Sequence, residues 1–216
     1  ASARGGRTAP PPLPRRLAWL ALIAAVYLAA GSFGLRFAHV DDRVSLVWAP
    51  TGLAIAAMAL LGRWTWPGVW LGAFLVNAPT SIPLWVTALL ATGNTLEALG
   101  ADWLLRRVGF RPAFDRARDA TSFLVLALPL APALSATTGT LALWAAGAVD
   151  AERASTLWST WYVGDVLGAL IVFPPVACWA AGVRRALDAR RLLEGAALVG
   201  LAAAVSAVAF GSWGLE

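Results

Sequence analysis

The chain has 216 residues, of which 59% are hydrophobic and only 13% are charged, and its formal net charge is +5. A soluble domain is on average about 45–50% apolar and about one quarter charged, so the composition excludes an ordinary soluble domain. All 17 basic residues are arginines. They lie in the gaps between apolar runs rather than in one patch, which argues against nucleic-acid binding.

Apolar runs recur along the whole chain with short polar segments between them. A helix needs roughly 20 apolar residues to cross a bilayer core of about 30 Å. We therefore predict an all-α, polytopic transmembrane helical bundle with about seven helices, in contact with the lipid bilayer. The predicted helices cover residues 17–37, 46–61, 64–78, 84–105, 123–148, 157–181 and 192–213.

The two ends of the chain differ in composition. Residues 1–16 are basic and rich in proline, which predicts a disordered arm before a transmembrane domain over residues 17–216. An odd number of crossings would leave Glu216 on the side opposite the N-terminus. One more crossing would return the chain to the first side, so we expect a domain that is truncated at its C-terminus.

Prolines inside several runs predict kinked helices. Pro129 and Pro132 interrupt the run over residues 123–148. That run could form one kinked helix or two half-helices, and the sequence leaves both open.

The arginines also predict an orientation. When the connections are assigned alternately to two sides, all arginines except Arg36, Arg43 and Arg153 fall on the side of the N-terminus. Short loops rich in arginine stay in the cytoplasm. We therefore expect a cytoplasmic N-terminus in a multi-pass protein of the bacterial inner membrane.

Single copies of two residue types exclude several kinds of site. The only cysteine is Cys178 and the only histidine is His39, so this chain cannot form an internal disulfide, a multi-histidine zinc site or bis-histidine haem ligation. No Walker-type or dinucleotide-binding glycine motif is present. We expect no metal, no cofactor and no catalytic constellation in this chain.

Charged groups inside the apolar runs are costly, so each carboxyl group there asks for an explanation. Asp102 has an ordinary one, because Arg106 follows at the spacing of a helical ion pair. Glu97 lies deeper, with Asn94 three residues earlier on nearly the same helix face. That pair could bind a polar ligand or clasp two helices together, and Asn77 adds a further polar group.

Asp165 lies about nine residues into its run, or roughly 13 Å deep at 1.5 Å per residue. Gly164 and Gly168 flank it at a spacing that allows close helix approach. An unpaired carboxyl group buried there favours its protonated form, and Asn94 or a backbone N–H could meet it. We expect a functional or conformational role for Asp165.

Six of the twelve tryptophans lie near predicted helix ends, which is typical of the aromatic belts of membrane proteins: Trp64, Trp66, Trp70, Trp85, Trp158 and Trp161. Trp48 and Trp161 could instead line a cavity on the external side together with Pro50. The candidate ligand or polar-core residues are therefore Trp48, Pro50, Asn77, Asn94, Glu97, Trp161 and Asp165.

Three stretches carry a family resemblance when read in order. They are VSLVWAPTGLAIAAMALLGRWTWPGVWLGAFLVN (44–77), ATGNTLEALGADWLLRRVGF (91–110) and STWYVGDVLGALIVFPPVACW (159–179). Together they resemble the membrane-associated sensor domain family, type one, of the MASE group. The positions that match its motifs are Trp48, Pro50, Gly52, Asn77, Asn94, Glu97, Gly164 and Asp165.

The resemblance implies an N-terminal input domain of a bacterial sensor histidine kinase or diguanylate cyclase. Such domains have about eight or more crossings and pass a membrane or periplasmic signal to a cytoplasmic output, which is not present in this chain. The resemblance also implies a homodimer formed through the absent output region, and an unknown small ligand or membrane partner protein.

A second function also fits the sequence. A small-solute transporter, or its membrane substrate-binding subunit, would equally contain kinked helices and carboxyl groups near the bilayer midplane. No internal inverted repeat is visible in the sequence, which counts against a transporter. A coding region for a kinase or cyclase downstream of this chain would favour the sensor.

Overall fold

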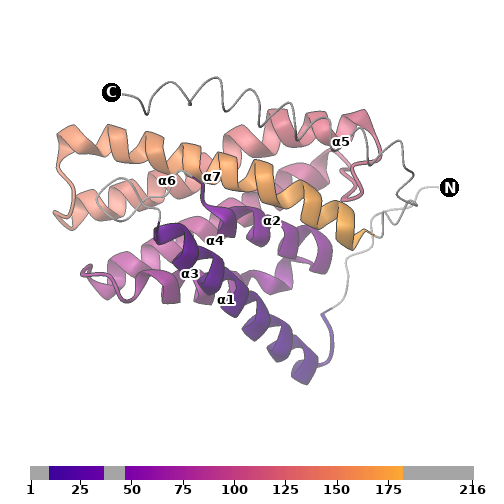
Figure 1. The fold of residues 1–216 in the computed structure, drawn as a ribbon, viewed down its shortest axis with the longest axis horizontal. Helices are drawn as coiled ribbons and strands as arrows, with labels where there is room; N and C mark the ends of the chain where they lie inside the picture. Colours follow the sequence, from indigo (N-terminus) through magenta and orange to yellow (C-terminus); the bar gives the residue numbers. More distant parts are fainter. Residues whose placement is uncertain (1–9, 37–46, 182–216) are drawn as a thin grey trace, which may run out of the picture. The chain divides into compact units, whose positions relative to one another are not determined.

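The computed structural model describes residues 10–36 and 47–181, and these residues form helices and connecting segments without a strand (Figure 1). The predicted all-α class is therefore confirmed. The seventh predicted run, over 192–213, lies outside the described residues. The helices are α1 (Leu13–Leu35), α2 (Ala49–Leu61), the 3₁₀ turn η1 (Arg63–Thr65), α3 (Trp66–Asn77), α4 (Leu84–Arg107), α5 (Ala117–Ser122), the π-helical turn η2 (Phe123–Ala127), α6 (Leu128–Ala145) and α7 (Ala151–Ala180).

Proline and glycine account for several helix ends. Pro14, Pro50 and Pro67 lie in the first turns of α1, α2 and α3, where a missing N–H costs no hydrogen bond. Helix α1 consequently begins at Leu13, inside the stretch that the sequence predicts as an arm. Gly62 ends α2 with a φ of 110°, a conformation that side chains with a Cβ rarely adopt.

Helices α2 and α3 are shorter than a bilayer core. They contain 13 and 12 residues, or about 20 and 18 Å at the rise of an α-helix. Three helical segments of the described part are long and apolar enough to cross a membrane, namely Leu13–Leu35, Ala117–Ala145 and Ala151–Ala180. The predicted runs over 46–61 and 64–78 are thus helical, but each falls short of the length that a lone membrane-crossing helix needs.

The fifth predicted run forms one continuous helix rather than two half-helices. Helix α5 passes through the π turn η2 directly into α6. Pro132 lies inside α6, where its missing N–H leaves the Leu128 carbonyl without the usual partner. The helix nevertheless continues to Ala145.

Contacts at the helix ends show that successive helices alternate in direction. At one end, the Arg16 guanidinium lies over the Trp64 ring, Arg63 bonds Asp102, and the Cys178 thiol lies near the Ala113 carbonyl. These contacts bring together the start of α1, the α2–α3 turn and the ends of α4 and α7. At the opposite end, Val86, Val149 and Leu157 pack in one apolar cluster.

Helix α2 lies within the bundle and packs against α1, α4 and α7, while α4 also packs against α3 and α6. The main apolar core includes Ile55 and Met58 of α2 together with Phe123 and Phe173. This arrangement surrounds the first turn of α2 with three long helices, and it is there that the buried polar groups meet.

Candidate functional site

Thr51, in the first turn of α2, lies between two buried carboxyl groups. Its hydroxyl oxygen is 2.9 Å from Asp165 Oδ1 on α7 and 3.3 Å from Glu97 Oε2 on α4. The three residues are 3%, 0% and 1% exposed for Thr51, Asp165 and Glu97, respectively. One hydroxyl group therefore joins α2, α4 and α7 in an otherwise apolar interior.

A second polar chain lies on the same helix faces. The Trp161 ring nitrogen donates to the Ser135 hydroxyl at 3.1 Å, and that hydroxyl donates to Asn94 Oδ1 at 3.4 Å. Asn94 precedes Glu97 by three residues on α4, and Trp161 precedes Asp165 by four on α7, so each pair shares a face. We call Thr51, Asn94, Glu97, Ser135, Trp161 and Asp165 the polar cluster.

Two atoms of the polar cluster have no hydrogen-bond partner within the described part of the chain. They are Glu97 Oε1 and Asp165 Oδ2, and both are fully buried. An unpaired polar oxygen in an apolar interior is costly, and an ionised one is far more so. The carboxyl pair therefore retains capacity to bind a proton or a donor group.

Close helix contacts hold the polar cluster together. A Cβ on Gly52 would meet Val172 Cβ at 2.6 Å and the Gly168 carbonyl at 2.7 Å, and a Cβ on Gly168 would overlap the Trp48 carbonyl. The Trp48 N–H also donates to the Gly164 carbonyl at 2.9 Å. Small residues thus let the start of α2 rest directly on the backbone of α7, which places Thr51 beside Asp165.

The family model of MASE1 matches residues 19–214. The chain belongs to the MASE1 family of membrane-associated sensor domains. Neither a curated protein nor a solved structure matches the chain. Family membership and the apolar helices establish this MASE1 domain as a membrane-embedded sensory input domain.

Four of the candidate residues predicted from the sequence of the MASE1 domain come together in the polar cluster: Asn94, Glu97, Trp161 and Asp165. The polar partner of Asp165 is the Thr51 hydroxyl, while Asn94 bonds Ser135 instead.

The other three candidates lie elsewhere. Pro50 is buried in the first turn of α2, and the Trp48 ring packs against Gly31 and Gly34 of α1. Asn77 ends α3 and donates to the Ala73 carbonyl of its own helix at 2.9 Å. These contacts give Trp48 and Asn77 positions in helix packing, and a cavity lined by Trp48, Pro50 and Trp161 stays a prediction.

Thr51 and Ser135 were not among the predicted residues. Thr51 was visible within the matched motif WAPTG, where a hydroxyl follows the helix-starting proline. Ser135 lies in an apolar run with neither a charge nor a spacing to single it out. A hydroxyl that bonds its own helix is ordinary in membranes, so only the packing of α6 on α4 and α7 identifies its role.

The MASE1 domain has a different ionic arrangement at the end where α4 terminates. Asp102 accepts hydrogen bonds from Arg63 at 2.6 Å and from Arg106 at 2.7 Å, and Arg106 also donates to the Met58 carbonyl. The predicted Asp102–Arg106 ion pair is confirmed. Arg63 is a second partner of Asp102 that the sequence did not predict. Asp102 thus has two arginine partners, whereas Glu97 and Asp165 form no ion pair with any described residue.

The connection between α4 and α5 has its own ionic anchor. Asp119 is buried, and it accepts hydrogen bonds from the Arg111 backbone N–H and the Arg116 side chain. The hydrogen bond to Asp119 raises the pKa of the Arg116 guanidinium. Among the described residues no three His, Cys, Asp or Glu side chains gather to hold a metal ion.

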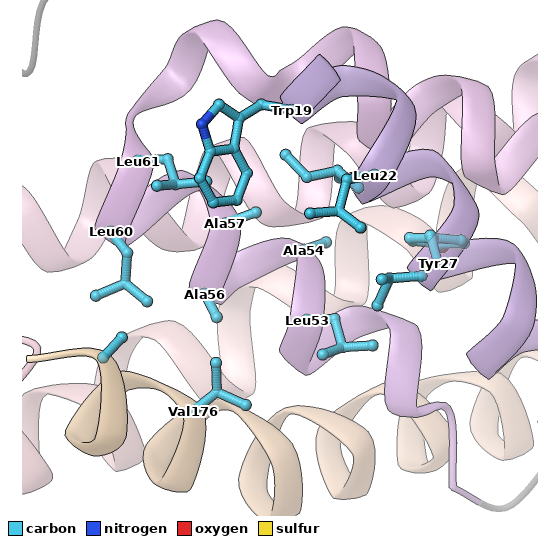
Figure 2. A pocket seen from close by; sticks show the side chains of 13 residues that line it. Trp19, Leu22, Tyr27, Leu53, Ala54, Ala56, Ala57, Leu60, Leu61 and Val176 are labelled. Atoms are coloured by element: carbon cyan, nitrogen blue, oxygen red, sulfur yellow. The ribbon is translucent and has the colours of Figure 1, made fainter. Parts of the chain in front are cut away.

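An apolar hollow of about 290 Å³ lies between α1, α2 and α7. Figure 2 shows Trp19 and Leu22 of α1 over the residues of α2, with Val176 of α7 on the far side. Tyr27 and Trp19 are the lining residues whose side chains carry a polar group. The hollow includes no member of the polar cluster, so it is separate from the candidate site. Its lining residues are Trp19, Leu22, Ile23, Val26, Tyr27, Leu53, Ala54, Ala56, Ala57, Leu60, Leu61, Val176 and Ala180.

Proposed function

We propose that this MASE1 domain receives a periplasmic or membrane signal and passes it to a cytoplasmic histidine kinase or diguanylate cyclase that lies outside these 216 residues. The observation that carries the proposal is the polar cluster, which links four helices through buried side chains with unused hydrogen-bonding capacity. A change in that cluster would reach all four helices at once.

The mechanism we propose is a two-state helix bundle. A small ligand or a membrane partner protein binds near the external half and favours one packing of α7 over the other. A ligand shifts such an equilibrium only through different affinities for the two states. The contact of Gly168 with Trp48 supports this mechanism, because a tightly packed interface responds to small displacements in discrete steps.

We further propose a location and an assembly. The protein lies in the bacterial inner membrane with its N-terminus in the cytoplasm, where its arginine-rich connections remain. Histidine kinases and diguanylate cyclases act as dimers, so we propose a homodimer formed through the output region. Lipid surrounds the apolar helices, and we propose no interaction with nucleic acid.

The first test is to read the gene beyond the codon for Glu216. A kinase or cyclase region in the same frame supports the proposal. A stop codon after one more hydrophobic segment, together with solute uptake by vesicles that contain the protein, would replace it with a transporter.

The second test is Asp165→Asn in the full-length protein. Asparagine keeps the shape of the side chain but changes its charge and proton chemistry, so we expect an altered dependence of output on the inducing condition, with normal membrane insertion. The measurement is phosphorylation or cyclic dinucleotide production in membrane vesicles. Asp150→Asn, exposed at the start of α7, is the control and should respond as the wild type does. Wild-type output from Asp165→Asn under every condition would contradict the proposal.

A further inference from the structure

The hydrogen-bond geometry at Thr51 indicates where a proton can bind. A threonine hydroxyl has one hydrogen to donate and two lone pairs that accept. Thr51 contacts two carboxyl oxygens, and the shorter distance is to Asp165, at 2.9 Å against 3.3 Å to Glu97. If Thr51 donates to Asp165, its contact with Glu97 becomes a second hydrogen bond only when Glu97 supplies a proton.

Among the described residues, no cation forms an ion pair with either carboxyl group to balance two negative charges. The ion pairs of the described part connect Arg63 and Arg106 to Asp102, Arg111 to Asp115, and Arg116 to Asp119. None of them reaches Glu97 or Asp165. Two carboxyl groups that share a buried site cannot both ionise at low cost. One proton bound between them removes half of the negative charge.

The helices packed around the pair contribute few charged or titratable side chains. Within the described ranges, α2 and α6 contribute no charged residue, and neither does α3. Tyr27 of α1 is a buried titratable side chain that interacts electrostatically with both carboxyl groups. The remaining charged or titratable residues of these helices and of α5 are Arg15, Arg16, Asp102, Arg106, Arg107, Arg118, Asp119, Glu152, Arg153, Tyr162 and Cys178.

We propose that Glu97, Thr51 and Asp165 form a proton-binding site, in which the Glu97 carboxyl group donates to the Thr51 hydroxyl and that hydroxyl donates to the Asp165 carboxylate. The pair then carries one proton and one negative charge. The idea that this proton is a ligand of the polar cluster rests on the proposed sensory function. Proton binding itself can be measured without any signalling output.

The position of the site gives this proton a structural consequence. Thr51 lies three residues from Trp48, whose backbone rests on Gly164 and Gly168 of α7. Loss of the proton removes the hydrogen bond from Glu97 to Thr51 and leaves two carboxylates facing one hydroxyl. Repulsion between them then opposes the packing of α4 and of α7 on the first turn of α2.

Infrared spectroscopy of the wild-type chain in lipid nanodiscs tests the site directly. Exposed aspartates and glutamates are ionised near neutral pH, so a protonated carboxyl band there reports a buried group. We expect one such band, which shifts when glutamate is isotopically labelled at its side-chain carboxyl carbon and disappears as the pH is raised. Absence of the band near neutral pH would overturn the proposal, as would a band that labelled glutamate leaves in place.

Variants and salts complete the test. Glu97→Gln should lose the band, Thr51→Ser should retain it, and Thr51→Val should change its frequency because the acceptor hydroxyl is gone. If Glu97→Gln fails to fold by circular dichroism, the labelled wild type decides alone. A band abolished by sodium chloride but not by choline chloride would mean that a metal cation is the ligand, and would overturn the proton site. None of these results depends on a signalling output, so they leave the sensory function to its own tests.

Discussion

At the scale of single residues, the buried carboxyl groups of this domain fall into two kinds. Asp102 and Asp119 each accept hydrogen bonds from arginine side chains, and their charge is balanced where helices meet the polar connections. Glu97 and Asp165 instead share one threonine hydroxyl and have no arginine partner within the described residues. The first kind stabilises the fold, and the second kind leaves binding capacity unused.

Asp102→Asn should therefore lower stability without removing a signalling group. The substitution leaves Arg63 and Arg106 without their anionic partner, while its own side chain stays buried. We expect a loss of about 1.5–3 kcal/mol, the range for hydrogen bonds to charged groups, measured as the free energy of unfolding in bicelles. Asp115→Asn is the control: its pair with Arg111 is exposed and 3.8 Å long, so about 0–1 kcal/mol is expected. Equal losses from the two variants would contradict this explanation.

The sequence predicted the members of the polar cluster that are unusual in a membrane and missed those that are ordinary there. Glu97, Asp165 and Asn94 stand out because polar groups in apolar runs are costly. Thr51 and Ser135 do not, because an uncharged hydroxyl group in an apolar run costs far less than a charged group does. Their role depends on contacts between helices distant in the chain, and no local pattern encodes those contacts.

At the scale of helices, Gly168 allows α7 to lie directly against the backbone at the start of α2. Gly168→Ala would drive its methyl group into the Trp48 carbonyl, which is backbone and cannot rotate away. We expect a loss of about 1–3 kcal/mol, typical of overpacking, and a lower midpoint of thermal unfolding in detergent. The separation of α2 from α7 would also disturb Thr51 and Asp165.

Gly100→Ala is the matched control for that contact. Its new methyl group would meet only the end of the flexible Leu134 side chain, at 3.0 Å. Alanine is also favoured over glycine inside a helix by roughly 0.5–1 kcal/mol. We expect the stability of Gly100→Ala to equal or slightly exceed that of the wild type. If Gly100→Ala loses as much stability as Gly168→Ala, the loss at Gly168 is not caused by its close contact with Trp48.

The helices themselves were largely predictable, but their lengths and irregular turns were not. Hydrophobic runs located the described helices other than the short α5, because apolar length is the main requirement of a bilayer. The same runs overestimated α2, because Val47 and Trp48 are apolar but lie before its first turn, and α3, because the 3₁₀ turn η1 extends to Thr65. The π turn at Phe123–Ala127 has no sequence signal of its own beyond the prolines that follow it.

At the scale of the whole domain, charge divides along the direction of the helices. The start of α1, the α2–α3 turn and the ends of α4 and α7 gather at one end through Arg16–Trp64, Arg63–Asp102 and Cys178–Ala113 contacts. The connections at that end carry most of the described arginines, whereas the connections at the other end carry Arg36 and Arg153. The side-chain contacts thus assign the loops to the same two ends as the arginine pattern does. The contacts come from the packing of the helices, whereas the pattern comes from the sequence alone.

A topology experiment tests the direction of this division. A reporter that is active only outside the cytoplasm should be active when fused after Val149, because the connection between α6 and α7 lies at the end poor in arginine. The same reporter fused after Pro112, in the arginine-rich connection between α4 and α5, should be inactive, while a fluorescent protein fused there should be bright. Activity in the reverse order would invert the orientation and leave the bundle unchanged. Activity at both sites would mean that α5, η2 and α6 do not cross the membrane as one helix, since that helix alone separates the two fusion points.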